Sequence, residues 1–285
     1  MATFFGEVLS VFSRAVEDEE DEDEVEEEEE DREIRRELEK RREVNVSWNA
    51  EISRAIEISS DYKLPCSCFI LAVGDNATGF VSSYILSSGS WEVFGYVTLW
   101  NERCREFVRS INKSCAESSC TFYRSTTDPT MMLCKCICFV AEDQQFQWCE
   151  KVFSSLQKNN MKVTVLTSCP VSNYKMSTYN IPEPFLKMLK TKEYQEETPC
   201  SLMEQPNIVD GLPAAVLTYC QVWQIPAVLY QCYTDITELN SITMEAFAPI
   251  LSCHRMTHLA ADKKNIKEAL ERTVKNREIE SNLYI

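Results

Sequence analysis

The sequence predicts an α/β layered fold, a sandwich with a mostly parallel or mixed sheet flanked by helices. Short apolar runs of strand length alternate along the chain with segments in which apolar residues recur at helical spacing. The 285 residues are 44% apolar, enough to bury a sizeable core. We expect an acidic, largely disordered N-terminal segment over residues 1–45, a single α/β domain over residues 60–279 and a flexible C-terminal tail over residues 280–285.

The N-terminal segment is set apart by its charge. Residues 17–31 contain fourteen acidic residues and no basic one, so we expect them to be disordered. Without these fourteen acids the net charge of −16 falls to −2, from 31 acidic and 29 basic residues. No basic patch stands out, which argues against nucleic-acid binding. Residues 31–43 alternate in charge and suit a solvated helix, and the folded body is expected to begin near Ser60.

In the first half of the body, apolar runs bounded by polar segments predict strands. The run at residues 66–73 ends at Gly74-Asp75-Asn76, and a helix is expected after it over about residues 77–86. Three further runs predict strands at residues 93–100, 120–123 and 132–140.

The second half continues the alternation of helices and strands. A helix is expected to begin at Glu142, with an apolar face formed by Phe146, Cys149, Val152, Phe153 and Leu156. The later elements are a strand at 162–167, a short helix at 185–189, a helix at 212–224, a strand at 227–233, and helices at 242–251 and 264–277. A polar hinge over residues 278–282 is expected to lead to the last three residues.

One long stretch lacks charge. No charged residue falls between Asp210 and Asp235, but Pro213 and Pro226 interrupt the stretch, and its glutamines would need hydrogen-bond partners in lipid. We therefore interpret it as a buried helix followed by a buried strand of a soluble protein.

The fourteen cysteines do not form the pattern of a secreted disulfide framework. Many lie in apolar runs, where a reduced thiol behaves as a small hydrophobe, and this predicts a reducing intracellular compartment. Cys134, Cys136 and Cys138 alternate along a predicted strand, so their thiols would project about 7 Å apart. That spacing is too wide for one ion, and we expect core cysteines and no metal site.

The sequence offers no catalytic or cofactor-binding constellation. Residues 74–79 have the glycine spacing of a phosphate-binding loop, but the Lys and Ser/Thr that must follow are absent. His254 and His258 lie one helical turn apart without the glutamate of a zinc protease. We expect a plain strand-to-helix turn, surface histidines, no catalytic residue and no cofactor.

The chain ends in Leu283-Tyr284-Ile285, a hydrophobic residue, a tyrosine and a terminal residue with its free carboxylate. Such an end can fill an apolar pocket while the carboxylate meets a lysine and backbone N–H groups at the pocket mouth. Eukaryotic proteins that dock on the proteasome α-ring carry this hydrophobic-Tyr-X ending. Leu283, Tyr284 and Ile285 are therefore the candidate partner-binding site.

Several long strings carry a resemblance to a known family. They are residues 1–8, residues 140–153, the block 202–235 with its strings 204–209 and 212–217, and residues 281–285. Together with the acidic N-terminal segment, they resemble the vertebrate proteasome assembly chaperones over almost the entire chain.

The resemblance implies a binding protein that is not an enzyme. It implies a heterodimer with a paralogue, proteasome assembly chaperone 2, that binds proteasome α-subunits, promotes formation of the 20S core α-ring and prevents off-pathway ring dimerisation. Leu283, Tyr284 and Ile285 would then dock in an α-ring pocket. The implied location is cytoplasmic, with association to the endoplasmic reticulum and presence in the nucleus, and without membrane insertion.

Two other functions stay open at this point. Because α/β sheets commonly hold ligands at strand ends, the alternative is an enzyme of nucleoside-phosphorylase or hydrolase type with its site at Gly74, Asp75 and Asn76. Micromolar binding of nucleotide or phosphate would favour that alternative. A third hypothesis is an acidic chaperone of basic proteins that acts through residues 17–31.

Overall fold

The structure is a computed structural model that describes residues 29–101, 120–175, 182–236, 238–253 and 256–282. The chain divides into two compact units, residues 1–41 and residues 42–285. The described part of the first unit is helix α2, Glu29–Arg41, whose side chains are exposed from residue 31 onward. The predicted solvated helix over residues 31–43 is thus confirmed, two residues earlier at each end.

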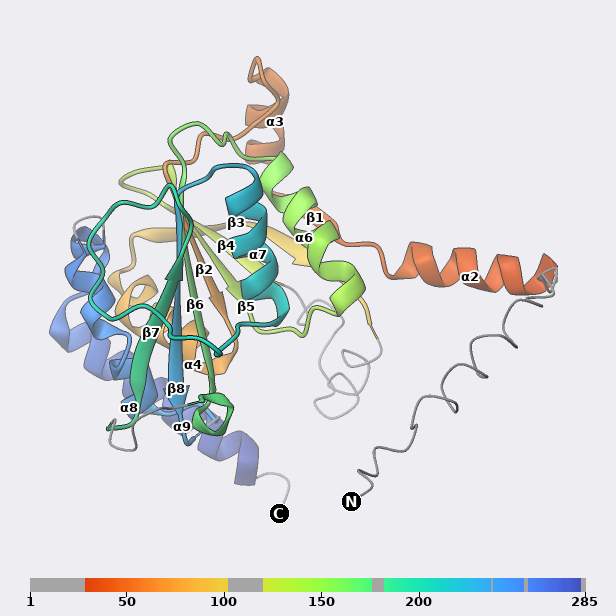
Figure 1. Cartoon of the computed structure of the whole chain (residues 1–285). Helices are drawn as coiled ribbons and strands as arrows, with labels where there is room; N and C mark the ends of the chain where they lie inside the picture. Colours follow the sequence, from red (N-terminus) through yellow and green to blue (C-terminus); the bar gives the residue numbers. More distant parts are fainter. Residues whose placement is uncertain (1–28, 102–119, 176–181, 237, 254–255, 283–285) are drawn as a thin grey trace, which may run out of the picture. The chain divides into compact units, whose positions relative to one another are not determined.

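The second unit is built on a mixed sheet of eight strands in the order β1-β3-β4-β5-β2-β6-β8-β7 (Figure 1). The four central strands β5, β2, β6 and β8 are parallel, and the others pair antiparallel at the two sides. The strands are β1 Asn45–Trp48, β2 Cys68–Val73, β3 Trp91–Thr98, β4 Cys120–Ser125, β5 Met131–Cys136, β6 Lys162–Pro170, β7 Phe185–Lys190 and β8 Ala227–Thr234. The predicted α/β class is confirmed.

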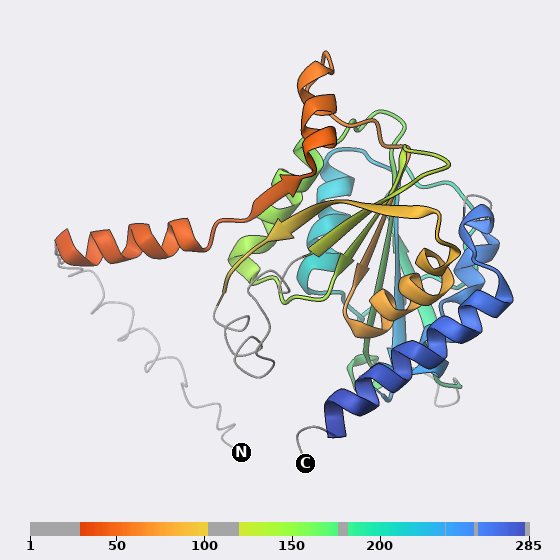
Figure 2. The same cartoon turned by 180° about the vertical axis from the view of Figure 1, so that it is seen from behind.

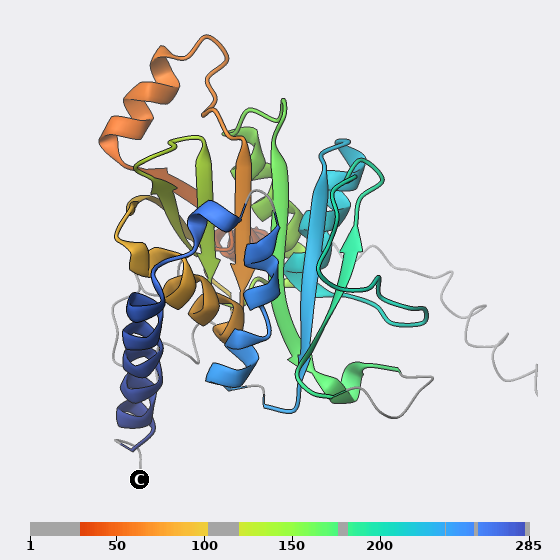
Figure 3. The ribbon, with the colours of Figure 1, turned by 90° about the vertical axis from the view of Figure 1, so that its left-hand side faces the viewer.

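Helices cover both faces of this sheet, which Figure 1 shows close to edge-on and Figure 3 shows from one face. On one face lie α6, Glu142–Ser154, and α7, Gly211–Val222, and on the other α4, Asp75–Tyr84, α8, Ser241–Glu245, and α9, Lys263–Asn282. One core cluster, with Trp148, Phe153 and Val216, lies between the sheet and α6 and α7. The other, with Phe80 and Phe247, lies between the sheet and α4 and α8. The unit therefore has three layers around two apolar interfaces.

The charge-free stretch is explained by strand β8. All eight of its residues are buried, because β8 lies inside the sheet and has helices over both of its faces. Strands of this kind read as continuous apolar runs. Among the described residues, no helix combines the length and apolarity needed to cross a membrane.

The folded unit begins earlier than residue 60, which corrects the predicted domain start. β1, Asn45–Trp48, pairs with β3, and helix α3, Ala50–Ile58, follows it. The Trp48 ring stacks on Phe94 with ring centroids 5.3 Å apart. β1 has only four residues, too few for a recognisable alternation, and its pairing partner lies about 50 residues away.

The segment at residues 185–189 is a strand, so the predicted short helix is wrong. β7 pairs antiparallel with β8, and the Met188 amide donates to the Ser201 carbonyl on its other side. Leu, Lys and Met are good helix formers, but hydrogen bonding to the edge of β8 outweighs that local preference.

Three other predicted boundaries are also corrected. The strand expected at residues 132–140 ends at Cys136, and the helix expected at residues 242–251 divides into α8 and the 3-10 helix Ala248–Ser252, which has Pro249 in its first turn. The polar hinge expected at residues 278–282 is helical, because α9 continues to Asn282. Phe146, expected on the inward face of α6, is 66% exposed, and Trp148 is buried instead.

Lys187 on β7 gives the first testable prediction. Its ammonium, nearly buried, donates to Glu204 Oε1 at 2.6 Å and to Ser201 Oγ at 3.0 Å. The hydrogen bond from Lys187 lowers the pKa of Glu204 most, and a second hydrogen bond from the Tyr174 hydroxyl lowers it further, from 4.5 to about 2. The folded state thus favours ionised Glu204, and the stability gained above pH 4.5 is lost as the pH falls toward 2.

We therefore expect the wild-type free energy of unfolding to fall more steeply between pH 6 and pH 3 than that of Glu204→Gln. The difference should be modest, since the Glu204 carboxylate is half exposed and solvent screens it. Urea unfolding at both pH values measures it, with Glu197→Gln as the control, because Glu197 is an exposed glutamate in the same segment between β7 and α7. Parallel pH profiles for wild type and Glu204→Gln would contradict the prediction.

Candidate functional site

The predicted docking residues Leu283, Tyr284 and Ile285 lie outside the described residues, but the element that carries them is described. Helix α9 packs against α4, as Figure 2 shows from behind, and its Ile266 and Leu270 lie against the second core cluster. The chain just before α9 is fixed as well, because the Ala261 amide donates to the Tyr84 carbonyl at 2.8 Å. The terminal tripeptide therefore follows directly on a helix of 20 residues, about 30 Å long, whose first half is anchored on the body.

A second candidate surface is the outer face of α7, which sequence reasoning missed. The buried residues of α7 are Leu212, Val216, Tyr219 and Cys220, which lie on its inner side. The helix is therefore covered on one side only, which corrects the prediction of a fully buried helix. The other stripe of the helix, which we call the α7 outer face, holds the partly or fully exposed residues Ala214, Leu217, Thr218, Gln221 and Val222, of which Leu217 also packs against the first core cluster. They recur at i, i+3, i+4, i+7 and i+8, which places them on one stripe of the helix.

The α7 outer face is unusual because it carries no charge. Solvent-facing stripes of surface helices normally carry charged side chains, whereas the chain from Gly211 to Thr234 has none. Val222 is 73% exposed, and Trp223 directly after the helix is 56% exposed. Lys158 Nζ lies 3.5 Å from the centroid of the Trp223 ring and donates to the Tyr219 hydroxyl at 2.8 Å. An uncharged stripe beside an exposed tryptophan with a neighbouring cation is typical of a protein-binding surface.

The end of strand β2 is a structural turn. Gly74 has φ of +84°, a backbone conformation that glycine adopts without strain. A Cβ on Gly79 would come within 2.6 Å of Leu239 Cδ1 and 2.7 Å of Met244 Sδ, so this glycine lets the β8–α8 connection and α8 pack on α4. The two glycines that mimic a phosphate-binding loop are therefore explained by backbone geometry and packing.

Asn76 is the polar residue that an enzyme would use at this strand end, but its side chain is hydrogen-bonded within the fold. Its side chain is fully buried, its Nδ2 donates to the Glu238 carbonyl at 3.1 Å and its Oδ1 accepts from the Asn240 amide at 2.8 Å. Both ends of the amide thus hold the connection between β8 and α8. A small cavity lined by Cys68, Tyr194 and Tyr230 measures about 20 Å³, room for little more than one water. Neither place suits a nucleoside.

The histidine pair of the sequence is only partly described by the structure. His258 lies exposed in the 3-10 helix Thr257–Leu259, and His254 lies outside the described residues.

The prediction that the thiols of Cys134, Cys136 and Cys138 are too far apart to form a cluster is corrected. It assumed that all three lie on one strand, but β5 ends at Cys136 and Cys138 is not on the strand. The sulfurs of Cys120, Cys136 and Cys138 lie within 4.8 Å of one another. Cys120 comes from the neighbouring strand, which the sequence spacing alone did not indicate.

Comparisons with known proteins add to this geometry. A family model, PAC1, described as proteasome assembly chaperone 4, matches residues 1–285. The chain is 67% identical to proteasome assembly chaperone 1 of Xenopus tropicalis over 287 residues, covering 100% of both chains. It is 48% identical to proteasome assembly chaperone 1 of Homo sapiens over 287 residues, covering 99% of both chains.

Two solved structures share the fold at low sequence identity. Pyrococcus furiosus PbaB, described as an archaeal proteasome activator, aligns with a TM-score of 0.54 at 10% identity, covering 86% of this chain and 100% of its own. Pyrococcus furiosus PbaA, described as an archaeal homologue of proteasome-assembly chaperone, aligns with a TM-score of 0.50 at 12% identity, covering 84% and 96%. At these identities the likeness concerns the fold alone.

Proposed function

This chain belongs to the proteasome assembly chaperone 1 family, a family of assembly chaperones and not of enzymes, and from this premise we propose that it assists assembly of the 20S proteasome. The observation that carries the proposal is the match over the full chain to relatives of that name. In the proposed activity, the chain and its paralogue, proteasome assembly chaperone 2, bind α-subunits, promote formation of the α-ring and prevent off-pathway ring dimerisation. We propose that this takes place in the cytoplasm, with pools at the endoplasmic reticulum and in the nucleus.

The C-terminal tripeptide is the proposed contact with the α-ring. Leu283 and Tyr284 would fill an apolar pocket, and the Ile285 carboxylate would pair with a lysine at the pocket mouth. Helix α9 supports this role because it is anchored on α4 at its start and continues to Asn282. A helix that reaches the tripeptide restricts its range of positions more than a flexible hinge would, and so lowers the entropy lost on docking.

The α7 outer face is the proposed contact with the paralogue. A heterodimer of two related folds needs an apolar surface of standard size that water does not cover in the complex. The uncharged stripe from Ala214 to Val222, with the adjoining Trp223, offers part of such a surface, and it lies on the opposite side of the sheet from α9. The two contacts would therefore not compete for one surface.

Recovery of the tagged chain from cells tests the proposed function. We expect stoichiometric paralogue together with proteasome α-subunits, identified by mass spectrometry, and loss of α-ring intermediates when the chain is depleted. Recovery of the chain with neither partner, together with unchanged α-ring formation after depletion, would overturn the proposal. Micromolar binding of a nucleotide would instead favour the enzyme alternative.

Deletion of the acidic residues 17–31 should leave α-ring assembly nearly intact. Charge that faces solvent is screened within about 8 Å at physiological salt, so we expect this acidic run to affect solubility or encounter rate more than a docked contact. Replacement of the segment by a neutral linker of equal length separates the effect of charge from that of length. Assembly can be followed by native gel electrophoresis of α-ring intermediates. If both variants stop assembly, the hypothesis of an acidic chaperone for basic proteins takes precedence.

A further inference from the structure

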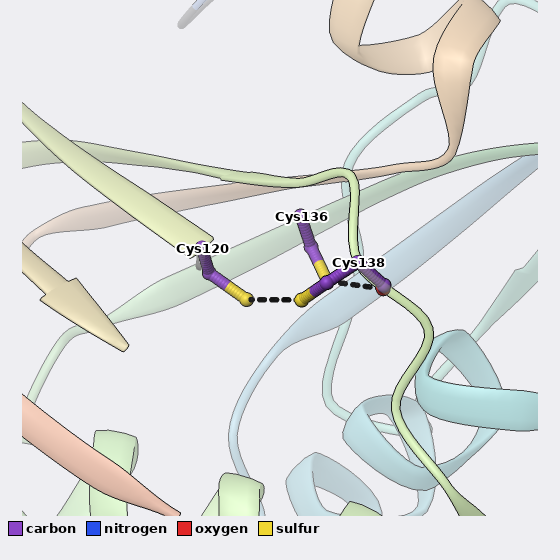
Figure 4. Close-up of side chains that lie close together, drawn as sticks. All are labelled: Cys120, Cys136 and Cys138. Atoms are coloured by element: carbon purple, nitrogen blue, oxygen red, sulfur yellow. Dashed lines mark hydrogen bonds between the residues drawn. The ribbon is translucent and has the colours of Figure 1, made fainter. Parts of the chain in front are cut away.

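Three thiols meet in the core cluster between the sheet and α6, and the proposed function does not use them. The Cys120 and Cys138 sulfurs are 3.7 Å apart, and those of Cys136 and Cys138 are 4.0 Å apart (Figure 4). Cys120 and Cys136 are fully buried, whereas Cys138 is partly exposed. The cluster is therefore held in the core and reaches the surface on one side.

The topology of the sheet brings the three cysteines together. β4 and β5 pair antiparallel with Thr121 opposite Lys135, so Cys120, at the start of β4, lies beside Cys136, at the end of β5. The chain then leaves the sheet, and the Cys136 thiol donates to the Cys138 carbonyl at 3.5 Å. This turn brings the Cys138 sulfur back toward the other two, as Figure 4 shows.

The spacing of the sulfurs matches a metal–thiolate site better than a disulfide. With zinc–sulfur bonds of about 2.3 Å and tetrahedral angles, bound thiolates lie about 3.8 Å apart. The two close separations of 3.7 Å and 4.0 Å are near that value, and all three sulfurs lie within 4.8 Å of one another. A disulfide would require a sulfur–sulfur distance of about 2.05 Å.

A buried donor faces the same cluster. The indole N–H of Trp148 on α6 is fully buried and makes no hydrogen bond to any described residue. This N–H lies close to the Cys120 sulfur. A neutral thiol is a weak acceptor, whereas a metal-bound thiolate would satisfy this N–H. An unsatisfied buried donor beside the Cys120 sulfur thus favours a thiolate there.

We propose that Cys120, Cys136 and Cys138 bind one Zn²⁺ ion, with a water as fourth ligand on the partly exposed side at Cys138. Binding forms three Zn–S bonds and releases the three thiol protons to solvent. The resulting site carries a net charge of −1, whereas Cu⁺ with three thiolates would carry −2, which costs more to bury in an apolar core. Thiolates without carboxylate or carbonyl ligands disfavour Mg²⁺ and Ca²⁺.

The test uses the full-length chain, reduced and freed of metal, and added Zn²⁺. We expect one equivalent of Zn²⁺ to bind, with affinity that falls as the pH is lowered because protons compete for the thiolates. Alkylation mapped by mass spectrometry should show Cys138 modified at least about tenfold more slowly with zinc than without it. Cys200, also partly exposed but outside the cluster, should react at the same rate in both conditions.

Cys138→Ser and Cys200→Ser provide the matched pair of variants. The first should lower zinc affinity by about tenfold or more, because a hydroxyl replaces a ligating thiolate, and the second should leave it unchanged. Both side chains are partly exposed, so both variants are expected to fold, which circular dichroism checks. The proposal is overturned if zinc leaves Cys138 alkylation unchanged, even where metal binds through other cysteines, or if Cys138→Ser binds zinc as tightly as wild type.

Discussion

Removal of Leu283, Tyr284 and Ile285 is expected to weaken the proposed binding of the heterodimer to the proteasome α-ring by about thirtyfold, while the proposed heterodimer itself stays intact. Docking of the tripeptide would bury an aromatic ring and pair a carboxylate with a lysine, an anchor that contributes about 2 kcal/mol, or roughly thirtyfold in affinity. The body is unaffected because its core clusters are formed by residues before the end of α9. In the proposed complex, contacts of the paralogue would retain part of the affinity through effective concentration, so a partial loss is expected.

Two further variants identify which part of the tripeptide acts. Tyr284→Ala removes the ring and keeps the carboxylate, whereas one residue added after Ile285 keeps the ring and displaces the carboxylate. Both should weaken binding, measured by biolayer interferometry on purified α-rings. Leu283→Val, which keeps an apolar side chain, is the control and should bind nearly as wild type. Equal affinities for the wild-type, truncated and extended proteins would contradict the proposed docking of the C-terminal tripeptide. They would not affect the family membership.

The substitution Val222→Glu is expected to weaken the heterodimer by about a hundredfold. Val222 is 73% exposed in the isolated chain, so a glutamate there costs the fold little. In a complex that covers the α7 outer face, the new carboxylate would be buried without a partner, at a cost of roughly 3 kcal/mol. Titration of the paralogue against the variant, followed by size-exclusion chromatography with light scattering, measures the loss.

Ile242→Glu is the matched control for this substitution. Ile242 is also an exposed aliphatic residue, 59% accessible, but it lies on α8 in the opposite helical layer. Its replacement introduces the same charge and should leave heterodimer affinity unchanged. If the two variants bind the paralogue equally well, the α7 outer face is not the interface. If Ile242→Glu alone loses binding, the interface lies on the α8 side.

Much of the fold was predictable because the central strands carry strong local signals. β2 is an uninterrupted apolar run and β8 a charge-free, mostly apolar one, and both lie between other strands with helices over both faces. α6 and α7 begin within one residue of their predicted starts at Glu142 and Leu212. The resemblance to a known family could also be recognised from the sequence alone, because it depends on stretches of consecutive residues such as 140–153 and 202–235.

Elements whose partners are distant in sequence were predicted poorly. β1 is stabilised by β3, about 50 residues later, and β7 by β8, about 40 residues later, so neither strand is specified by its own residues. The exposed stripe of α7 was interpreted as buried because composition reports how apolar a helix is and not how many sides are covered. Phe146 was assigned to the core by a spacing that Trp148 satisfies in the structure.

The sequence by itself determined the acidic segment, the alternation of strands and helices and the terminal Leu283-Tyr284-Ile285, since each depends on residues adjacent in the chain. Only the tertiary structure decided that Asn76 is held by the Glu238–Asn240 connection, that the α7 outer face is uncovered, and that Cys120 joins Cys136 and Cys138. These arrangements arise from strand order and helix packing, which bring together groups that no sequence spacing relates.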